Sequence, residues 1–210
     1  MTTTHTDSPQ TNTPDDDVIA AGDKVRLRLK RLADARADYS WRRDETLARY
    51  DAARALKQPY EGFLANFRDE LLHPHNFRRT FGVESLAGEH IGNVMYYNID
   101  HSRGEAELGV TIGHTAYWGR GYGTQAVRLL VRYIFDTTPL NRVYLHTLDW
   151  NVRAQRAFAS AGFRDCGRSR RGPHRFHRME IRRPTQQDTS SETSDEPASS
   201  RPSSGPIASD

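Results

Sequence analysis

The sequence has only one cysteine, Cys166, among its 210 residues. A single cysteine excludes an intramolecular disulfide and a zinc cluster built from several thiolates. No apolar run approaches the roughly 20 residues of a membrane-spanning helix, and the N-terminus lacks the apolar segment of a secretory signal. Two histidine pairs, His73/His75 and His174/His177, lack the further residues that would complete a ligand set. These absences predict a cytoplasmic protein without a metal.

Basic residues are also nearly absent from both ends of the chain. Residues 1–23 contain five acidic side chains and no Lys or Arg, and residues 184–210 contain five acidic side chains against Arg201 alone. The first segment is rich in Thr, Asp and Pro and the second in Ser, Thr and Pro, and neither contains enough apolar surface to offset the entropy lost on ordering. We therefore predict a disordered acidic N-terminal tail (1–23), one folded domain (24–183) and a disordered C-terminal tail (184–210).

The modest net charge of the whole chain, +3, conceals a basic domain. Between residues 24 and 183 there are 29 basic and 17 acidic side chains, which leaves a net charge of +12. Such a domain attracts polyanions, for example the phosphates of a coenzyme, a nucleic acid or a ribosome surface. The same composition also fits an ordinary surface of solvated arginines, and the acidic tails could fold back onto the domain.

Hydrophobic periodicity predicts an α+β fold. Strands are expected at residues 24–30, 77–85, 90–99, 105–113, 142–148, 163–171 and 174–183. Helices are expected at residues 32–56, 60–72 and 125–135, and from Asn151 to the glycine at 162. The order strand, helix, strand from 105 to 148 is that of a right-handed parallel crossover, whereas the other neighbours are antiparallel. The sheet is therefore mixed, with about seven strands, strong twist and flanking helices.

A glycine-rich loop, Trp118-Gly119-Arg120-Gly121-Tyr122-Gly123-Thr124, leads directly into the amphipathic helix at residues 125–135. Its glycines allow a phosphate to approach the main chain, and the first amides of the helix point at that space without internal partners. The alternative is that the glycines only form a tight turn. A nucleotide-triphosphate loop is excluded because its last glycine is followed by Lys and then Ser or Thr, a pair that is absent here. A dinucleotide-binding fingerprint is excluded because its glycines are spaced differently.

This loop and a second segment together resemble a known family. Arg120-Gly121-Tyr122-Gly123-Thr124 and Asn151-x-x-Ala154-x-x-x-Phe158-x-x-x-Gly162-Phe163 are similar to the two signature segments of the GNAT superfamily of acetyl-CoA-dependent N-acetyltransferases. The Tyr117-Trp118 lead-in is similar to the RimJ/RimL-type ribosomal-protein and spermidine acetyltransferase branch. The resemblance covers about residues 24–183. Trp118 departs from the Gln or Arg that many members carry.

The resemblance implies a sheet that is splayed open at an acetyl-CoA site. Backbone amides near Ile112, Gly113 and His114 would hold the thioester carbonyl, and the loop from Trp118 to Thr124 would hold the diphosphate. Asn151 has two compatible roles, as helix N-cap and as a contact to the pantetheine arm. The full set of implied binding residues is Ile112, Gly113, His114, Trp118, Gly119, Arg120, Gly121, Tyr122, Gly123, Thr124, Asn151 and Phe158.

Acetyl transfer to an amine requires a base, because an alkylamine with a pKa near 10 is mostly protonated at neutral pH. Glu107 is the candidate: it alternates with the apolar residues of its strand, so it faces away from the core, and it matches the position of the glutamate base in many GNAT enzymes. The alternative is a structural pair with an arginine. Glu105, on the same strand face, is the substitute.

Phe158 stands where many GNAT enzymes have a tyrosine that protonates the departing thiolate. A phenyl ring has no proton to donate, so water, another hydroxyl such as that of Tyr117, or direct departure of the thiolate must replace it. Phe158 is then expected to pack against the pantetheine arm or the core.

The resemblance makes residues 32–72 one wall of the acceptor pocket. Their acidic side chains, Asp51 among them, are interpreted mainly as a solvated helix face. Binding of a cationic substrate is the secondary interpretation. The leading hypothesis is an N-acetyltransferase that acts on a protein N-terminus or a small polyamine-like amine. The alternative is a catalytically weak RNA- or ribosome-associated protein that uses the +12 charge of the domain. The arginines at residues 164–178 fit either an RNA-binding surface or an ordinary solvated one. The protein is expected to be a monomer or a homodimer.

Overall fold

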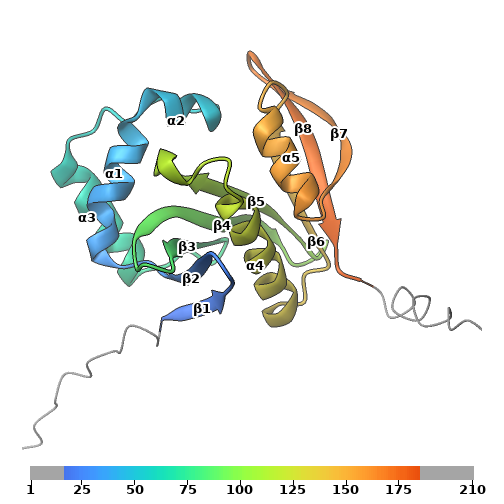
Figure 1. Cartoon of the computed structure of the whole chain (residues 1–210), viewed down its shortest axis with the longest axis horizontal. Helices are drawn as coiled ribbons and strands as arrows, with labels where there is room; N and C mark the ends of the chain where they lie inside the picture. Colours follow the sequence, from blue (N-terminus) through green and yellow to red (C-terminus); the bar gives the residue numbers. More distant parts are fainter. Residues whose placement is uncertain (1–16, 185–210) are drawn as a thin grey trace, which may run out of the picture.

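The computed structural model describes residues 17–184, and its strands form one sheet in the order β1-β2-β3-β4-β5-β6-β8-β7 (Figure 1). The strands are β1 (Val18–Ala21), β2 (Val25–Leu29), β3 (Arg78–Ser85), β4 (His90–Asp100), β5 (Glu105–Ile112), β6 (Arg142–Leu148), β7 (Arg164–Arg171) and β8 (His174–Arg182). The helices are α1 (Ala35–Arg43), α2 (Glu45–Tyr50), α3 (Tyr60–Leu72), α4 (Tyr122–Thr137) and α5 (Val152–Ser160), with short 3-10 helices at Leu32–Asp34 and Thr115–Tyr117. The α+β class and the mixed sheet are confirmed, with eight strands rather than about seven.

The additional strand, β1, lies inside the stretch predicted to be a disordered tail. It pairs antiparallel with β2, with Val18 opposite Arg28 and Ala21 opposite Arg26. The predicted tail boundary at residue 23 is therefore wrong for residues 18–21. Four residues are too few to show a strand period, and their hydrogen-bonding partner lies on another strand. The rest of the predicted tails, residues 1–16 and 185–210, falls outside the described residues.

The first predicted helix, residues 32–56, is broken into shorter pieces. Asp44 has extended backbone geometry (ψ 118°), and its side chain accepts a hydrogen bond from the amide of Leu47 at 2.9 Å. It therefore ends α1 and caps α2. Ala52 then adopts a left-handed conformation (φ 52°), which stops α2 and leaves Asp51 at its end. The second predicted helix, α3, has the expected bounds.

The core lies between one face of the sheet and α4. Alternate residues of the strands, such as Val94, Leu108 and Val143, are buried against Leu130 and Ile134 of that helix. The predicted alternation of β5 is confirmed, because Leu108 faces this core. Within residues 17–184 no helix is both long and apolar enough to cross a bilayer.

The sheet divides between β5 and β6. These parallel strands are paired only where Glu105–Glu107 lie opposite Arg142–Tyr144. Beyond that point β5 stays with β4 through Ile112, whereas β6 follows β8 through Leu148. The N-terminus of α4 and the helix α5 lie beside the opening between the two halves (Figure 1). The splayed sheet predicted from the sequence is therefore present, and it positions the candidate site.

Candidate active site

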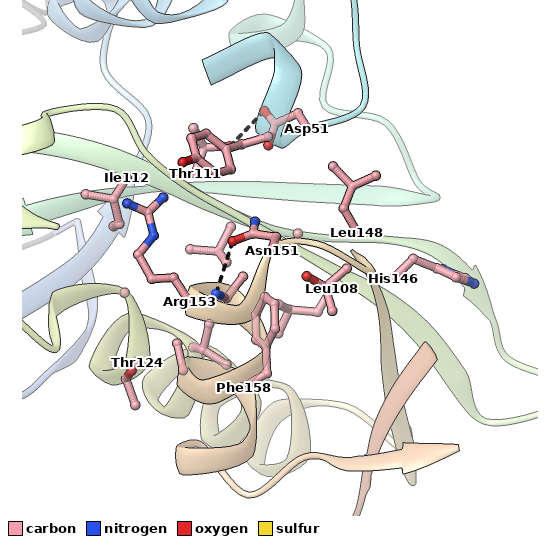
Figure 2. Close-up of a pocket in the computed structure, with 18 of the residues that line it drawn as sticks. Asp51, Leu108, Thr111, Ile112, Thr124, His146, Leu148, Asn151, Arg153 and Phe158 are labelled. Atoms are coloured by element: carbon pink, nitrogen blue, oxygen red, sulfur yellow. Dashed lines mark hydrogen bonds between the residues drawn. The ribbon is translucent and has the colours of Figure 1, made fainter. Parts of the chain in front are cut away.

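A cleft of about 940 Å³ occupies the opening in the sheet. Its walls come from the separated ends of β5 and β6, the loop before α4, the first turns of α4 and α5, and the end of α2 (Figure 2). Side chains from segments that are far apart in the sequence therefore meet in one space large enough for an extended ligand.

The glycine-rich loop forms one end of this cleft. Gly119 (φ 70°) and Gly121 (φ 83°) are both left-handed, and Gly121 is the N-cap of α4. A Cβ on Gly119 would meet no atom within 4 Å, and one on Gly121 would meet only Lys24 Cε at 3.7 Å. The loop therefore borders open space, towards which the first amides of α4, from Tyr122 onward, lack helical acceptors. This geometry fits a bound phosphate.

Two cations stand beside the loop. Lys24 Nζ lies 5.7 Å from the centre of the Tyr122 ring, and the Arg120 guanidinium lies 5.8 Å from the same ring. Arg120 also donates to the carbonyl of Ala116 at 3.3 Å, so its side chain is held at the loop. Lys24 was missed by the sequence analysis, because no local pattern connects β2 with a loop almost 100 residues later.

The backbone of β5 differs in part from the expectation. The amides of Gly113 and His114 both donate to the carbonyl of Ile91, at 3.0 and 3.2 Å, so they are not available to a thioester carbonyl. The prediction is wrong for these two residues. Because alternate residues of an antiparallel strand point to opposite sides, the main-chain groups of Ile112 and Val110 face the opening instead. The carbonyl of Ile112 accepts a hydrogen bond from Trp118 at 2.6 Å.

The opposite wall of the cleft comes from α5. Asn151 is 8% exposed and caps this helix, because its side chain accepts a hydrogen bond from the amide of Ala154 at 3.2 Å. Phe158 is also buried and lines the cleft, with its ring 6.1 Å from that of Phe163. Asn151 and Phe158 therefore lie in the cleft wall, as expected (Figure 2).

Trp118 belongs to a cluster that connects the walls near the mouth of the cleft. The guanidinium of Arg153, from α5, lies 3.8 Å from the Trp118 ring centre and 4.8 Å from that of Tyr50. Tyr50, at the end of α2, meets Trp118 edge-on at 5.5 Å. Figure 2 shows Arg153 reaching from α5 towards Ile112. Three elements that are separate in the sequence are thereby held together.

Glu107 is buried deeper than the sequence suggests. It is 3% exposed and is not part of the cleft wall. Its carboxylate accepts hydrogen bonds from His146 Nδ1 at 2.8 Å and Asn98 Nδ2 at 3.0 Å, and Arg171 lies 3.9 Å away. With Nδ1 donating to the carboxylate, Nε2 is the acceptor nitrogen of His146, and Arg171 Nη2 lies 3.5 Å from it. His146 lines the cleft, so Glu107 reaches that space through His146.

The two substitutes considered from the sequence both have other partners. Glu105 forms an ion pair with Arg142 and is not part of the cleft wall. Tyr117 does line the cleft, but its hydroxyl donates to Glu89 Oε2 at 2.6 Å, and this hydrogen bond is the main cause that raises the pKa of Tyr117.

Asp51 is the acidic side chain of the 32–72 region that enters the cleft. It lies at the end of α2, and its Oδ2 accepts a weak hydrogen bond from the hydroxyl of Thr111 on β5 at 3.4 Å (Figure 2). Asp51 is exposed to solvent and lines the cleft. The protein around its carboxyl group nevertheless desolvates it and raises the pKa of Asp51 to about 6, against the smaller opposing effects of Thr111 and Arg42.

No group of three or more His, Cys, Asp or Glu side chains between residues 17 and 184 is arranged to hold a metal ion. The histidine pairs noted in the sequence thus gain no further ligands within this part of the chain.

The fold and the cleft define an α+β protein with a split sheet and a phosphate-sized cradle at a helix N-terminus. The sequence profile of the acetyltransferase (GNAT) domain family matches residues 24–164. The chain therefore belongs to the GNAT acetyltransferase family.

Relatives and solved structures agree with this assignment. The uncharacterized N-acetyltransferase p20 of Bacillus licheniformis is 32% identical over 79 residues, which are 38% of this chain and 44% of that protein. The chain thus matches less than half of that relative's length. A spermidine N-acetyltransferase from Vibrio cholerae, solved with CoA and spermine, has a TM-score of 0.67 at 22% identity, over 75% of this chain and 95% of that one. The aminoglycoside acetyltransferase AAC(6')-Ib, solved with coenzyme A, has a TM-score of 0.64 at 21% identity, over 76% and 95%.

Proposed function

We propose that the protein transfers an acetyl group from acetyl-CoA to a primary amine. The observation that carries this proposal is one continuous cleft with an open, glycine-lined amide cradle at one end and the Glu107–His146 pair at the point where the strands separate. The family match and the CoA-bound structures of similar fold support the choice of donor.

The donor would lie along β5. Its diphosphate would accept hydrogen bonds from the free amides of Tyr122, Gly123 and Thr124, with Lys24 and Arg120 supplying positive charge. Its pantetheine arm would follow the open edge of β5 past Asn151 and Phe158, and the amide of Ile112 would donate to the thioester carbonyl. A donor placed there stabilises the negative charge that this oxygen gains during attack.

The proton of the acceptor would leave through His146. Nε2 takes one proton from the ammonium group, and the neutral amine attacks the carbonyl carbon. As the carbon–sulfur bond breaks, the newly bonded nitrogen loses its second proton to water or to the departing CoA thiolate, which leaves the neutral amide. Glu107 holds Nδ1–H and balances the charge that the imidazole gains. The base predicted from the sequence would thus act through a neighbouring side chain rather than by direct contact with the amine.

The acceptor would be a protein N-terminus or a small amine, in keeping with the RimJ/RimL-like and spermidine acetyltransferase branch that the sequence resembles. The proposal includes a cytoplasmic location, which rests on the sequence alone. Calorimetric titration with acetyl-CoA and CoA, followed by thiol-release assays with spermidine, kanamycin and peptides with free N-termini, tests it. If neither acetyl-CoA nor CoA produces heat on titration, the proposed acetyl donor is refuted. If none of the tested amines is acetylated, the proposed reaction is refuted.

A second candidate function, binding to RNA or a ribosome, is favoured by the β7–β8 hairpin. This hairpin ends the sheet, and its exposed arginines are Arg164, Arg168, Arg170, Arg171, Arg175, Arg178 and Arg182. Arg170 lies directly opposite Arg175, a like-charged pair that an anionic partner would stabilise. Affinity for an RNA oligonucleotide that falls steeply with salt is expected from this function. Equal retention of RNA at low and high salt would contradict it.

A further inference from the structure

Asp51 and Thr111 form a second polar corner of the cleft, opposite His146. Thr111 and Glu107 are on the same face of β5, which is the face turned away from α4. Thr111 and His146 both line the cleft, on the two strands that separate beyond Glu107 and Tyr144. The two polar corners therefore border the same cleft, one on each side of the opening in the sheet.

The floor between these corners is partly apolar. Gly109 lacks a side chain there, and Met95 of the neighbouring strand lies close enough that a Cβ on Gly109 would be 3.1 Å from its Cγ. An ammonium group above this floor finds no charged partner in Gly109 or Met95, so the nearest carboxylate determines whether it binds there. Among the described residues that line the cleft, Asp51 is the acidic one.

We propose that Asp51 binds the ammonium group of the acceptor and presents it to His146. The inference rests on the proposed acetyl transfer and names a specificity-determining residue for it. Asp51 has no ion pair within 4 Å among the described residues, and its second carboxylate oxygen has no hydrogen-bond donor there. Its carboxylate is therefore free to accept hydrogen bonds from a cation in the cleft.

The other charged and titratable groups near this corner are mostly cationic. Arg42 of α1 acts on Asp51, and the cleft also contains Arg78 of β3, Tyr97 of β4, His146 of β6, and Arg153 and Arg156 of α5. Tyr97 has its pKa raised by burial and by Glu107, so it stays neutral. A cationic acceptor is repelled by most of the cleft, and Asp51 supplies the attraction that directs it to one corner.

Asp51→Asn tests the proposal because it keeps the size of the side chain and an acceptor oxygen for Thr111. Thiol release is measured with spermidine and with kanamycin between pH 5 and 9. We expect the KM for the amine to rise at least tenfold at pH 7.5, with kcat changed less than threefold and CoA affinity unchanged. In the wild type, kcat/KM for the amine falls as Asp51 is protonated below pH 6, and the variant lacks this component.

Two further variants separate a local effect from a general one. Glu45→Gln removes a negative charge from the exposed start of α2, outside the cleft, and is expected to leave the KM unchanged. Thr111→Val removes the hydroxyl that favours the ionised carboxylate, so the acid limb should move to higher pH. If wild-type protein acetylates either amine and Asp51→Asn matches it in KM and pH profile, the inference is overturned while the proposed function stands. If wild-type protein binds no CoA or acetylates neither amine, the proposed function falls, and the inference with it.

Discussion

Replacing Glu107 with glutamine tests the centre of the proposed mechanism. The carboxylate accepts from both His146 Nδ1 and Asn98 Nδ2, whereas a glutamine side chain has one acceptor oxygen and one donor nitrogen. If the new amide nitrogen faces His146, Nδ1 becomes the acceptor, Nε2 carries the proton, and the imidazole can no longer take one from the amine. A positioned base contributes about 10²- to 10⁴-fold to such a reaction, so we expect turnover to fall by at least tenfold and by up to that range.

The assay is thiol release at saturating amine, together with calorimetric titration of CoA. Because Glu107 is not part of the cleft wall, CoA affinity should stay the same in Glu107→Gln. His146→Gln and the double variant complete a cycle: since the two residues act as one unit, the double variant should be no slower than the slower single one. Multiplicative losses in the double variant, or unchanged turnover in Glu107→Gln, would refute the reasoning.

Three further outcomes follow from the structure. Gly121→Ala should lose about 1–2 kcal/mol of stability and much of its CoA affinity, because φ is +83° at the glycine-rich loop. Gly172→Ala, at φ +58° in the β7–β8 turn, should lose similar stability but keep its CoA affinity. Thermal unfolding with and without CoA measures the stability and the CoA binding of both variants. Asp34→Asn should lower the unfolding free energy by about 1.5–3 kcal/mol in urea titrations, because it removes the charged partner at 2.8 Å from buried Arg28 and leaves it only Glu84 at 2.6 Å. Trp118→Phe should abolish most of any change in tryptophan fluorescence on CoA binding, since Trp118 lines the cleft.

The Asp34 effect also has a defined pH dependence. Burial alone would raise the pKa of Asp34, but the hydrogen bond from Arg28 and the charges of Lys30 and His90 together hold it well below its ordinary value. A carboxyl group with a lowered folded-state pKa contributes its full stability above its unfolded-state pKa of about 4. That contribution is lost as the pH falls below this value. Wild-type stability should therefore decline more steeply than that of Asp34→Asn on acidification, as urea titrations at pH 3 to 6 would measure.

Local signals in the sequence were enough for most of the fold. The alternation in β5 and the apolar stripe of α4 are properties of consecutive residues, so both elements were predicted. The bounds of β5 are correct to one residue, whereas α4 begins at Tyr122, three residues before the predicted start, and ends at Thr137, two residues after the predicted end. The role of Gly121 in the loop was also predicted, because a left-handed backbone conformation favours glycine at that position in the sequence. In contrast, β1 depends on pairing with β2, and the break at Asp44 depends on which of two local hydrogen-bonding patterns its side chain adopts.

The site was less accessible to sequence reasoning because its contacts are non-local. Glu107 meets His146 across 39 positions, and Asp51 meets Thr111 across 60. Neither distance leaves a pattern in a single sequence, so Glu107 was expected to face the substrate and Asp51 was weighed first as solvated surface. The carbonyl of Ile91, which accepts from two amides that were expected to be free, is a further consequence of tertiary pairing.

The phenylalanine at position 158 is compatible with this chemistry. Its ring is buried in the cleft wall, and Tyr117, the nearest hydroxyl considered from the sequence, already donates to Glu89. A thiol of pKa about 8.5 leaves as a thiolate at pH 7 at a cost of about 2 kcal/mol relative to the protonated form. An amine leaving group, with its much higher pKa, would need a proton from the protein. Acetyl transfer from a thioester therefore needs a base for the acceptor more than an acid for the leaving group, which is the balance of residues found around this cleft.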